Sequence, residues 1–547
     1  MKNLIPEKET LTVEFKSDKK KISDEVIIDS VVAFANTEGG EFYLGVEDDG
    51  TVSGIHPEHE DYTRLAAFIA NKTIPPISTI VEEIDAEYPV IKITVPKSRQ
   101  IVASTVGKIQ RRKMKADNTP ENIPMYPYEI NSRLSELSML DYSSLPVPDS
   151  NYDDLDKNER ERLRSILRNY NGEEYLLNLD DEELDKALQL VKQVDGKLVP
   201  TFAGMLLIGK ENKLREYIPT AEVIIQQLQG SNVIVNKSIH FPILKSLEIV
   251  FNFIDARNPE YEMEFGLFRM SIPDYNIRAI REAVVNAFSH RDYTRLGAIR
   301  VQMDDDGLSI SNPGGFIEGV TLYNLLTVEP HGRNPVLADA LKRLGLAERS
   351  GRGVDRIFEG SLMYGKPSPD YSDSTAVVVR LFIPRSIPDE NFVKMLNEEE
   401  KRTNKLPSIN SLLILNILKQ GRRMTLSDLA TETHIIESKL RATVERLLES
   451  GLVEATGNGK NREYILSSKV YKNKLDYVRQ SNIDSIRYPE MILKLAKEKT
   501  YITRNDVIEL LHVTSSQAYR LLKTLTDERK LRLLGNGRNA SYKLIKD

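Results

Sequence analysis

Three acidic residues near the start of the sequence have a spacing that suits metal-dependent chemistry on a phosphate. Glu9 and Glu14 lie just before and within the first predicted strand, and Asp48 follows a predicted strand at residues 41–46. Carboxylates that converge in this way could hold a hard divalent cation such as Mg²⁺ or Mn²⁺, which prefers oxygen ligands. Such an ion activates water and stabilises charge on a phosphate. Carboxylates near a strand edge are also common turn and cap residues, and that interpretation stays open.

A second group, in the centre of the chain, has the residue types of a nucleotide site. Glu282 and Asn286 are spaced i, i+4 on a helix predicted to begin near Asn276, so they share one face, and His290 lies one turn further. Glycine-rich turns allow close approach to a nucleotide, and helix N-termini offer free N–H groups to phosphate. The other members of the group are Asn312, Gly314, Gly315, Arg333, Gly351 and Gly353.

Basic residues that suit a nucleic-acid backbone gather near residues 107–118, in the predicted strand GKIQRRKMKADN. Their density is sufficient to contact successive phosphates. A solvated edge strand guarded by charge has the same composition, so this alternative remains. The candidate nucleic-acid contacts here are Lys16, Lys108, Arg111, Arg112 and Lys113.

The C-terminal region, residues 407–545, contains an internal repeat: Thr425 and Asp428 match Thr503 and Asp506 at a constant offset. Each copy reads as an apolar helix, a Thr-capped helix, a third helix and a two-stranded wing. This order resembles a tandem pair of winged helix-turn-helix domains, whose third helix enters the major groove. Solvated helix charges in a dimerisation domain are the alternative. The candidate DNA contacts are Lys439, Arg441, Lys460, Arg520 and Arg538.

These groups require several domains to position them, and the length of 547 residues allows three or four. Stretches rich in Ser, Pro and Asp at 143–154, and around 384–392, are typical of linkers. We expect a multidomain α+β protein. Its predicted parts are an α/β domain at 1–135, an intermediate α/β region at 150–265, a nucleotide-binding α/β sandwich at 266–390, and winged helix-turn-helix domains at 405–470 and 485–547.

The N-terminal segment resembles the Schlafen/AlbA-like family over roughly residues 4–130. The resemblance rests on VEFK at 13–16, AFANTEGG at 33–40 and GVEDDG at 45–50. In Schlafen nucleases a Glu, a second Glu five residues on and an Asp after this strand form a metal-dependent RNA-cleaving site. The resemblance implies these roles for Glu9, Glu14 and Asp48. Many bacterial relatives are treated as nucleic-acid binders only, which is the alternative.

The central segment, NIRAIREAVVNAFSHRDY at 276–293, ISNPGGF at 310–316 and residues 333–357, resembles the divergent GHKL ATPase of RecG-like regulators. The resemblance implies ATP and Mg²⁺, with Glu282 polarising the attacking water and Asn286 coordinating the ion. Asn312 replaces the Asp with which most members read adenine, so base selectivity stays open. Binding without hydrolysis is the alternative. The chain contains no G-x-x-x-x-G-K-[ST] loop, so a helicase function has no support.

The bulk composition excludes several classes of protein. The chain has no cysteine, which rules out disulfides and thiolate zinc sites. Its first residues lack the apolar stretch of a signal peptide, and no apolar run approaches the ~20 residues that span a bilayer. We therefore expect a soluble, cytoplasmic protein. The net charge of −6 means that nucleic-acid contacts must come from local basic patches.

Two functions remain open from the sequence. The first is an ATP-regulated nucleic-acid-binding effector, acting as a metal-dependent Schlafen-like nuclease on RNA, tRNA or DNA. The family context for that function is antiphage defence. The second is an ATP-sensing transcriptional regulator without nuclease activity, whose winged helices bind operator DNA. GHKL modules often act as dimers, so a homo-oligomer is expected in both cases, with no membrane partner.

Overall fold

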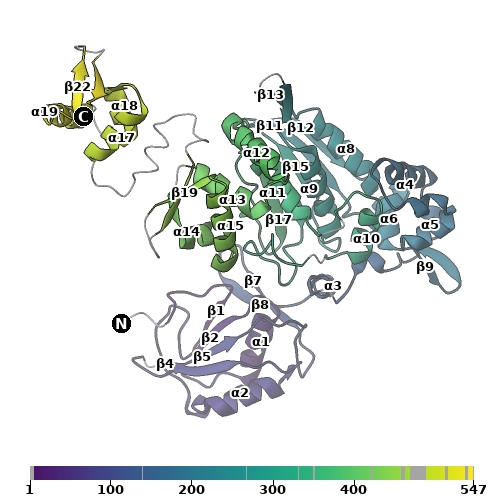
Figure 1. Cartoon of the computed structure of the whole chain (residues 1–547). Coiled ribbons are helices and arrows are strands. Elements are labelled where there is room, and N and C mark those ends of the chain that lie inside the picture. Colours follow the sequence, from purple (N-terminus) through teal and green to yellow (C-terminus); the bar gives the residue numbers. More distant parts are fainter. Residues whose placement is uncertain are drawn as a thin grey trace.

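A computed structural model shows a mixed α/β multidomain protein, as the sequence predicts (Figure 1). It describes residues 5–84, 86–137, 139–265, 268–329, 332–348, 351–420, 423–456, 462–467, 488–511, 515–535 and 540–545. The candidate wing residues Lys460 and Arg538 lie outside the described residues.

The N-terminal domain is built on a four-stranded sheet with strand order β1-β2-β5-β4, in which β1 and β2 are parallel. One face of the sheet packs against two helices through apolar residues such as Ile27 and Phe42. Its helices and strands are β1 (Val13–Lys16), α1 (Asp24–Ala35), β2 (Gly40–Leu44), α2 (Tyr62–Asn71), the pair β3 (Thr73–Ile74) and β6 (Ala103–Ser104), β4 (Ile80–Ile84) and β5 (Val90–Val95).

The turn between α1 and β2 depends on glycine. Gly39 has a φ of +71°, and a Cβ there would lie 2.7 Å from the backbone N of Lys97. Only glycine adopts such a conformation at little cost, so the helix end predicted from Asn-Thr-Glu-Gly-Gly is confirmed. A hairpin of β7 (Gln110–Met114) and β8 (Pro120–Pro124) packs on α1, and α3 (Pro127–Glu136) leads on to the central part of the chain.

The centre of the chain is one unit with a single apolar core that runs from Val147 to Ile383. Its five-stranded sheet has the order β12-β11-β15-β16-β17, and β11 pairs in parallel with β15. The structure therefore differs from the division expected at residues 265/266, because strands from both sides of that boundary share one sheet. The strands are β11 (Val223–Gln229), β12 (Asn232–Ile239), β15 (Ile299–Met303), β16 (Gly307–Pro313) and β17 (Val378–Pro384).

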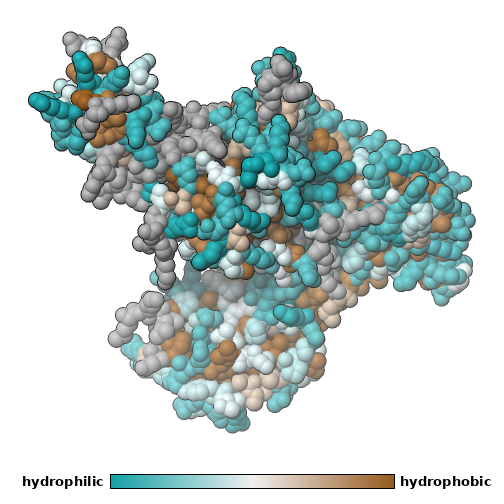
Figure 2. Space-filling view, in the orientation of Figure 1, coloured by the Kyte–Doolittle hydropathy of each residue, from teal (hydrophilic) through white to brown (hydrophobic). Residues whose placement is uncertain are grey.

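Helices pack around this sheet, and the hairpin of β13 (Glu260–Phe265) and β14 (Phe268–Pro273) precedes the helix that carries Glu282. The helices and the remaining hairpin of this unit are α4 (Lys157–Asn169), α5 (Asp181–Ala187), β9 (Val191–Val194), β10 (Lys197–Pro200), α6 (Phe202–Ile208), α7 (Glu211–Tyr217), α8 (Ile243–Asp255), α9 (Ile277–His290), α10 (Pro335–Arg343) and α11 (Gly353–Leu362). Figure 2 shows a largely hydrophilic surface over α4 and α5, as expected for helices that bury only one face.

The C-terminal repeat has the predicted element order in both copies. The first contains α13 (Ile409–Lys419), β18 (Met424–Thr425), α14 (Leu426–Thr433), α15 (Glu437–Glu449), β19 (Val453–Thr456) and β20 (Glu463–Leu466) and follows α12 (Glu390–Thr403). The second contains α17 (Tyr488–Glu498), β21 (Ile502–Thr503), α18 (Arg504–Leu511), α19 (Ser515–Asp527), β22 (Leu531–Leu534) and β23 (Ser541–Leu544).

The predicted caps of the short helices are confirmed. Thr425 Oγ1 accepts from the N–H of Asp428 at 3.2 Å, and Thr503 Oγ1 accepts from Asp506 at 3.3 Å. The first copy shares an apolar core with α11 and α12, whereas the second has a core of its own. Among the described residues, no helix is long and apolar enough to span a bilayer.

Candidate functional site

The Glu14 carboxylate lies inside the N-terminal domain and is held by cations. The residue is only 4% exposed, and Oε2 lies 2.6 Å from Arg112 Nη1. Oε1 lies 3.1 Å from Lys16 Nζ, and Asn122 Nδ2 donates to the same oxygen at 3.2 Å. Glu9 accepts from the backbone N–H of Phe15 at 2.8 Å. Both carboxylate oxygens of Glu14 and one of Glu9 are therefore already engaged within the chain.

Asp48 does not join the two glutamates. It is exposed in the turn after Val46, and Val46 packs with Phe15 on the sheet face opposite to Glu14. Because neighbouring residues of a strand point to opposite faces, Glu14 lies on the side of α1 instead. Among the described residues, no group of three or more His, Asp or Glu side chains is arranged to hold a metal ion. The residues present do not fit the expected three-carboxylate metal site.

Arg112 has a different role from the one the sequence predicts. It was expected to contact nucleic acid, yet it is 3% exposed and lies over the Phe34 ring at 4.4 Å. Its guanidinium donates to the carbonyls of Thr10 and Leu11, both at 2.9 Å. Burial lowers the pKa of Arg112, which the charge of Glu14 partly opposes. Arg112 therefore stabilises the domain as the partner of Glu14.

The other basic candidates of this domain divide into two groups. Lys108 pairs with Glu25 and Asp29, and Arg111 pairs with Glu129 on α3. Lys113 is exposed on β7.

In the C-terminal copies, the exposed candidates on α15 and α19 are Lys439, Arg441 and Arg520.

The central residues expected to bind nucleotide, except Gly314 and Arg333, line one cavity of about 210 Å³. Asn276 caps α9 through bonds from the N–H groups of Arg278 and Ala279, so the predicted helix start is confirmed. The helix then presents Glu282, Asn286 and His290 to the cavity. Residues from β16 and from the N-terminus of α11 complete the predicted part of the lining: Asn312, Gly315, Gly351 and Gly353.

Glu282 is a buried carboxyl at the wall of this cavity, 6% exposed. Burial raises its pKa, and the charge of Arg356 and the backbone N–H of Glu348 oppose that effect. Burial also raises the pKa of the neighbouring Tyr371 phenol, so this ring stays protonated. A carboxyl whose pKa is moved toward neutrality is suited to exchange a proton with water.

The glycines around the cavity serve the packing of the chain itself as well as ligand approach. A Cβ on Gly353 would lie 2.1 Å from Glu282 Oε1, and one on Gly315 would lie 2.4 Å from the Ala376 carbonyl oxygen. Gly314 has a φ of +100°, and a Cβ at this position would collide with the side chain of Asp292. No side chain caps the N-terminus of α11 at Arg352, and Gly353 and Val354 of its first turn line the cavity. Such a helix end is suited to phosphate.

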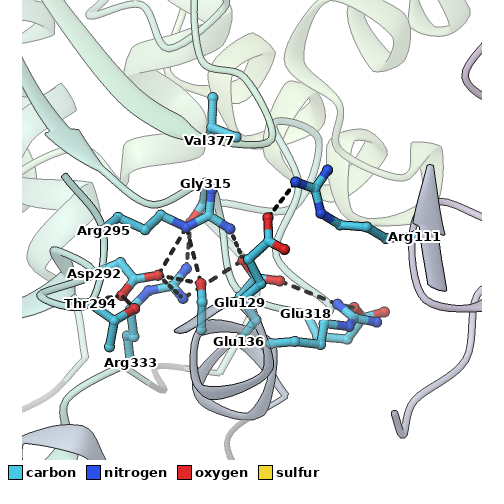
Figure 3. A network of polar contacts seen from close by, with 12 residues as sticks. Arg111, Glu129, Glu136, Asp292, Thr294, Arg295, Gly315, Glu318, Arg333 and Val377 are labelled. Carbon is cyan, nitrogen blue, oxygen red and sulfur yellow. Dashed lines mark hydrogen bonds and ion pairs between the residues drawn. The ribbon is translucent and has the colours of Figure 1, made fainter. Parts of the chain in front are cut away.

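Arg333 lies beside the cavity in a buried polar network rather than in its lining (Figure 3). It is 1% exposed, and Nη2 donates to the Gly315 carbonyl at 3.0 Å. Its Nη1 lies 3.5 Å from Asp292 Oδ2. Burial alone would raise the pKa of Asp292, but Arg333 and the Ser132 hydroxyl bring it below its usual value. This network joins the site to α3.

Sequence reasoning missed the segment at 316–329. Val320, Leu325 and Val328 line the cavity. The same segment contacts the first C-terminal copy: Leu326 packs on its core, and the Tyr323 ring meets the His434 ring edge-on at 4.5 Å. The cavity residues of this segment are mostly apolar, and its one acidic lining residue, Glu329, stands in no motif that would have marked it.

Comparisons with known proteins match two of these parts. Residues 9–120 match the family model "Schlafen, AlbA_2", and residues 297–381 match "Putative ATP-dependent DNA helicase recG C-terminal". The chain carries a Schlafen AlbA_2 domain and a RecG C-terminal-type ATPase-like domain. The first match contains Glu9, Glu14 and Asp48, whereas the second begins after α9 and so leaves out Glu282. Residues 133–224 match a domain of unknown function, DUF8451.

The search of curated proteins found no match. Among solved structures, the DIP2311 protein from Corynebacterium diphtheriae aligns over 98% of this chain and 95% of that one, at 19% identity and a TM-score of 0.48. The mRNA-binding domain of elongation factor SelB from E. coli, in complex with SECIS RNA, aligns over 25% of this chain and 98% of that chain, at 18% identity and a TM-score of 0.12. Both TM-scores are low, so neither similarity indicates a function for this chain.

The placement of Glu14 predicts a structural role in the Schlafen AlbA_2 domain. Glu14→Ala leaves Arg112 buried without its carboxylate, and we expect the free energy of unfolding of this domain to fall by about 3 kcal/mol. Urea denaturation measures the loss. Asp48→Ala is the matched control, because its exposed carboxylate should be removable at little cost.

The same experiment tests the metal site. Mg²⁺ or Mn²⁺ should leave the unfolding midpoint of the wild-type domain unchanged. A midpoint that rises with either ion, and loses that rise in Asp48→Ala, would contradict the structural role.

The raised pKa of Glu282 predicts a pH-dependent stability of the ATPase-like domain. A carboxyl with a raised folded-state pKa contributes stability that is fully present at low pH and is lost as pH rises through that pKa. Glu282→Gln removes the buried charge, so we expect its melting temperature to exceed that of the wild type at pH 8. The difference should shrink toward pH 5.

Thermal unfolding at several pH values measures this difference. Glu182→Gln is a suitable control, because that side chain is 52% exposed on α5. A Glu282→Gln domain that is less stable than the wild type at pH 8 would show that the charged form is favoured by its neighbours.

Proposed function

We propose that this protein binds nucleic acid under the control of ATP. The observation that carries the proposal is the segment at 316–329, because one side of it lines the central cavity and the other contacts the first C-terminal copy. A ligand in the cavity must therefore act on a segment that also holds the helices expected to bind DNA. The Schlafen AlbA_2 and RecG C-terminal matches support nucleic acid and ATP as the two ligands.

The cavity residues fit a nucleotide. The uncapped N-terminus of α11, with Gly351 and Gly353, is suited to hold phosphate groups. Asn286 lines the same cavity and would coordinate Mg²⁺, which needs only one or two protein ligands when phosphates supply the rest. Asn312 presents an amide to the cavity for the base. When bound, ATP would supply a phosphate bond whose hydrolysis is coupled to nucleic-acid binding.

Within this site, Glu282 is the residue suited to orient water and accept its proton. It lies against Gly353, so it is adjacent to the helix end that would hold the phosphates. Burial raises the pKa of Glu282 above its usual value, which makes it a stronger base toward water than an exposed glutamate. Glu282→Gln keeps the shape of the side chain but removes the base, so we expect ATP binding without turnover.

Because Glu14 is paired with Arg112 and Lys16, we do not expect the N-terminal domain to cleave nucleic acid with a metal ion. Strand scission in the presence of Mg²⁺ or Mn²⁺, absent in Asp48→Ala, would restore the nuclease interpretation. ATP-dependent binding to a specific duplex, without scission, would favour the transcriptional regulator.

The coupling between the cavity and the C-terminal copy is testable with Tyr323→Ala. Tyr323 contacts His434 and is not part of the cavity lining. We expect ATP affinity to stay unchanged, whereas the effect of ATP on nucleic-acid affinity, about 5-fold or more in the wild type, is lost. Fluorescence anisotropy of labelled duplex DNA, single-stranded DNA and RNA, with and without ATP, measures both quantities.

Leu322→Ala is the matched control, because this neighbouring residue is 38% exposed. An ATP effect that persists in Tyr323→Ala would show that the contact with His434 does not transmit it. Nucleic-acid affinity that is independent of ATP in the wild type would overturn the proposed function.

A further inference from the structure

Two tyrosines at the start of α3 form an exposed stack. The rings of Tyr126 and Tyr128 have centroids 6.1 Å apart and planes inclined by only 11°. Each residue is 53% exposed with all the described parts of the chain in place. Aromatic rings are usually buried because of their large apolar area, so a parallel pair left in solvent marks a binding surface.

The chain holds this pair in a fixed position. Pro127 occupies the first turn of α3, and the Tyr126 N–H donates to Glu129 Oε2 at 2.9 Å. The other oxygen of Glu129 pairs with Arg111 on β7, which ties the tyrosines to the basic hairpin. The N–H of Met125 also donates to the Ile109 carbonyl, at 2.8 Å. Rigid rings lose little conformational entropy when a ligand stacks on them.

The hairpin next to the pair supplies positive charge. Lys113 and Lys115 are exposed on β7 and at its end, and Arg111 lies between them and α3. Glu121 faces Lys113 across the hairpin and Asp117 interacts with Lys115, so both exposed lysines have a carboxylate near them that a phosphate would have to displace. Cations beside a pair of flat aromatic faces are the two features that bind a phosphate backbone and its bases together.

We propose that Tyr126 and Tyr128 are a stacking site for the unpaired bases of a single-stranded nucleic acid. The inference rests on the proposed function and specifies its substrate class. Bases in a duplex already stack on their neighbours, so they offer no free face to the rings. Unpaired bases of either DNA or RNA do, and the same rings accept both because every base has a flat face. The site therefore selects single strands over duplexes.

The absence of tryptophan from the chain allows a direct test. Tyr126→Trp introduces a single indole, and stacking of a base on it quenches its fluorescence. We expect quenching by single-stranded DNA and single-stranded RNA, and little by the matching duplex. Tyr88→Trp is the control, because Tyr88 is 52% exposed on the same domain but away from the hairpin. It should show no quenching.

Affinity provides the second measurement. Tyr126→Ala with Tyr128→Ala should weaken binding of single strands roughly 5-fold or more. Duplex affinity and the unfolding midpoint should stay unchanged. Tyr126→Phe with Tyr128→Phe keeps both aromatic faces and should retain wild-type affinity.

The outcomes separate this site from the proposed function. ATP-dependent binding that is unchanged in the double Ala variant, with no quenching in Tyr126→Trp, would overturn the stacking site alone. The absence of binding by any nucleic acid, with or without ATP, would overturn both. A comparison of DNA with RNA at equal sequence shows which single strand the site prefers.

Discussion

The pair of Asp292 and Arg333 is the interaction on which the arrangement of the central site depends. Both side chains are 1% exposed, so neither charge can be left without the other. Arg333 also donates to Gly315, which lines the cavity, and the Ser132 hydroxyl of α3 donates to Asp292 at 2.5 Å. The cavity wall and the helix from the N-terminal domain are therefore fixed by one buried charge pair.

The N-terminal domain contains a similar buried pair, Glu14 and Arg112. This pair gives Glu14 a structural role in place of the metal-binding role that the sequence motif predicts. A glutamate at position 14 reads as a metal ligand from its spacing, but the 2.6 Å contact with Arg112 neutralises it within the fold. Two buried, paired charges contribute specificity of packing rather than an open coordination site. Lys113 and the tyrosine pair lie instead on the exposed surface of the domain.

The segment at 316–329 lies between the central cavity and the first C-terminal copy and contacts both. Its apolar residues line the cavity, and Leu326 and Tyr323 contact the first C-terminal copy. The two sets of contacts are therefore made by one short segment. The second copy has a separate core.

The sequence by itself determined the local features: the helix from Asn276, the glycine turn after α1, the Thr-capped helices of the repeat and the face of α9 that presents Glu282, Asn286 and His290 to the cavity. Each of these depends on contacts between near neighbours, such as a cap or a face with i, i+4 spacing. Only the tertiary structure decided that Glu14 is buried against Arg112 whereas Asp48 is exposed in a turn. The same holds for the pairing of β11 with β15 and for the burial of Arg112 and Arg333. These outcomes depend on strand alternation and on partners that lie on other elements, tens of residues away in the sequence, and local spacing encodes neither.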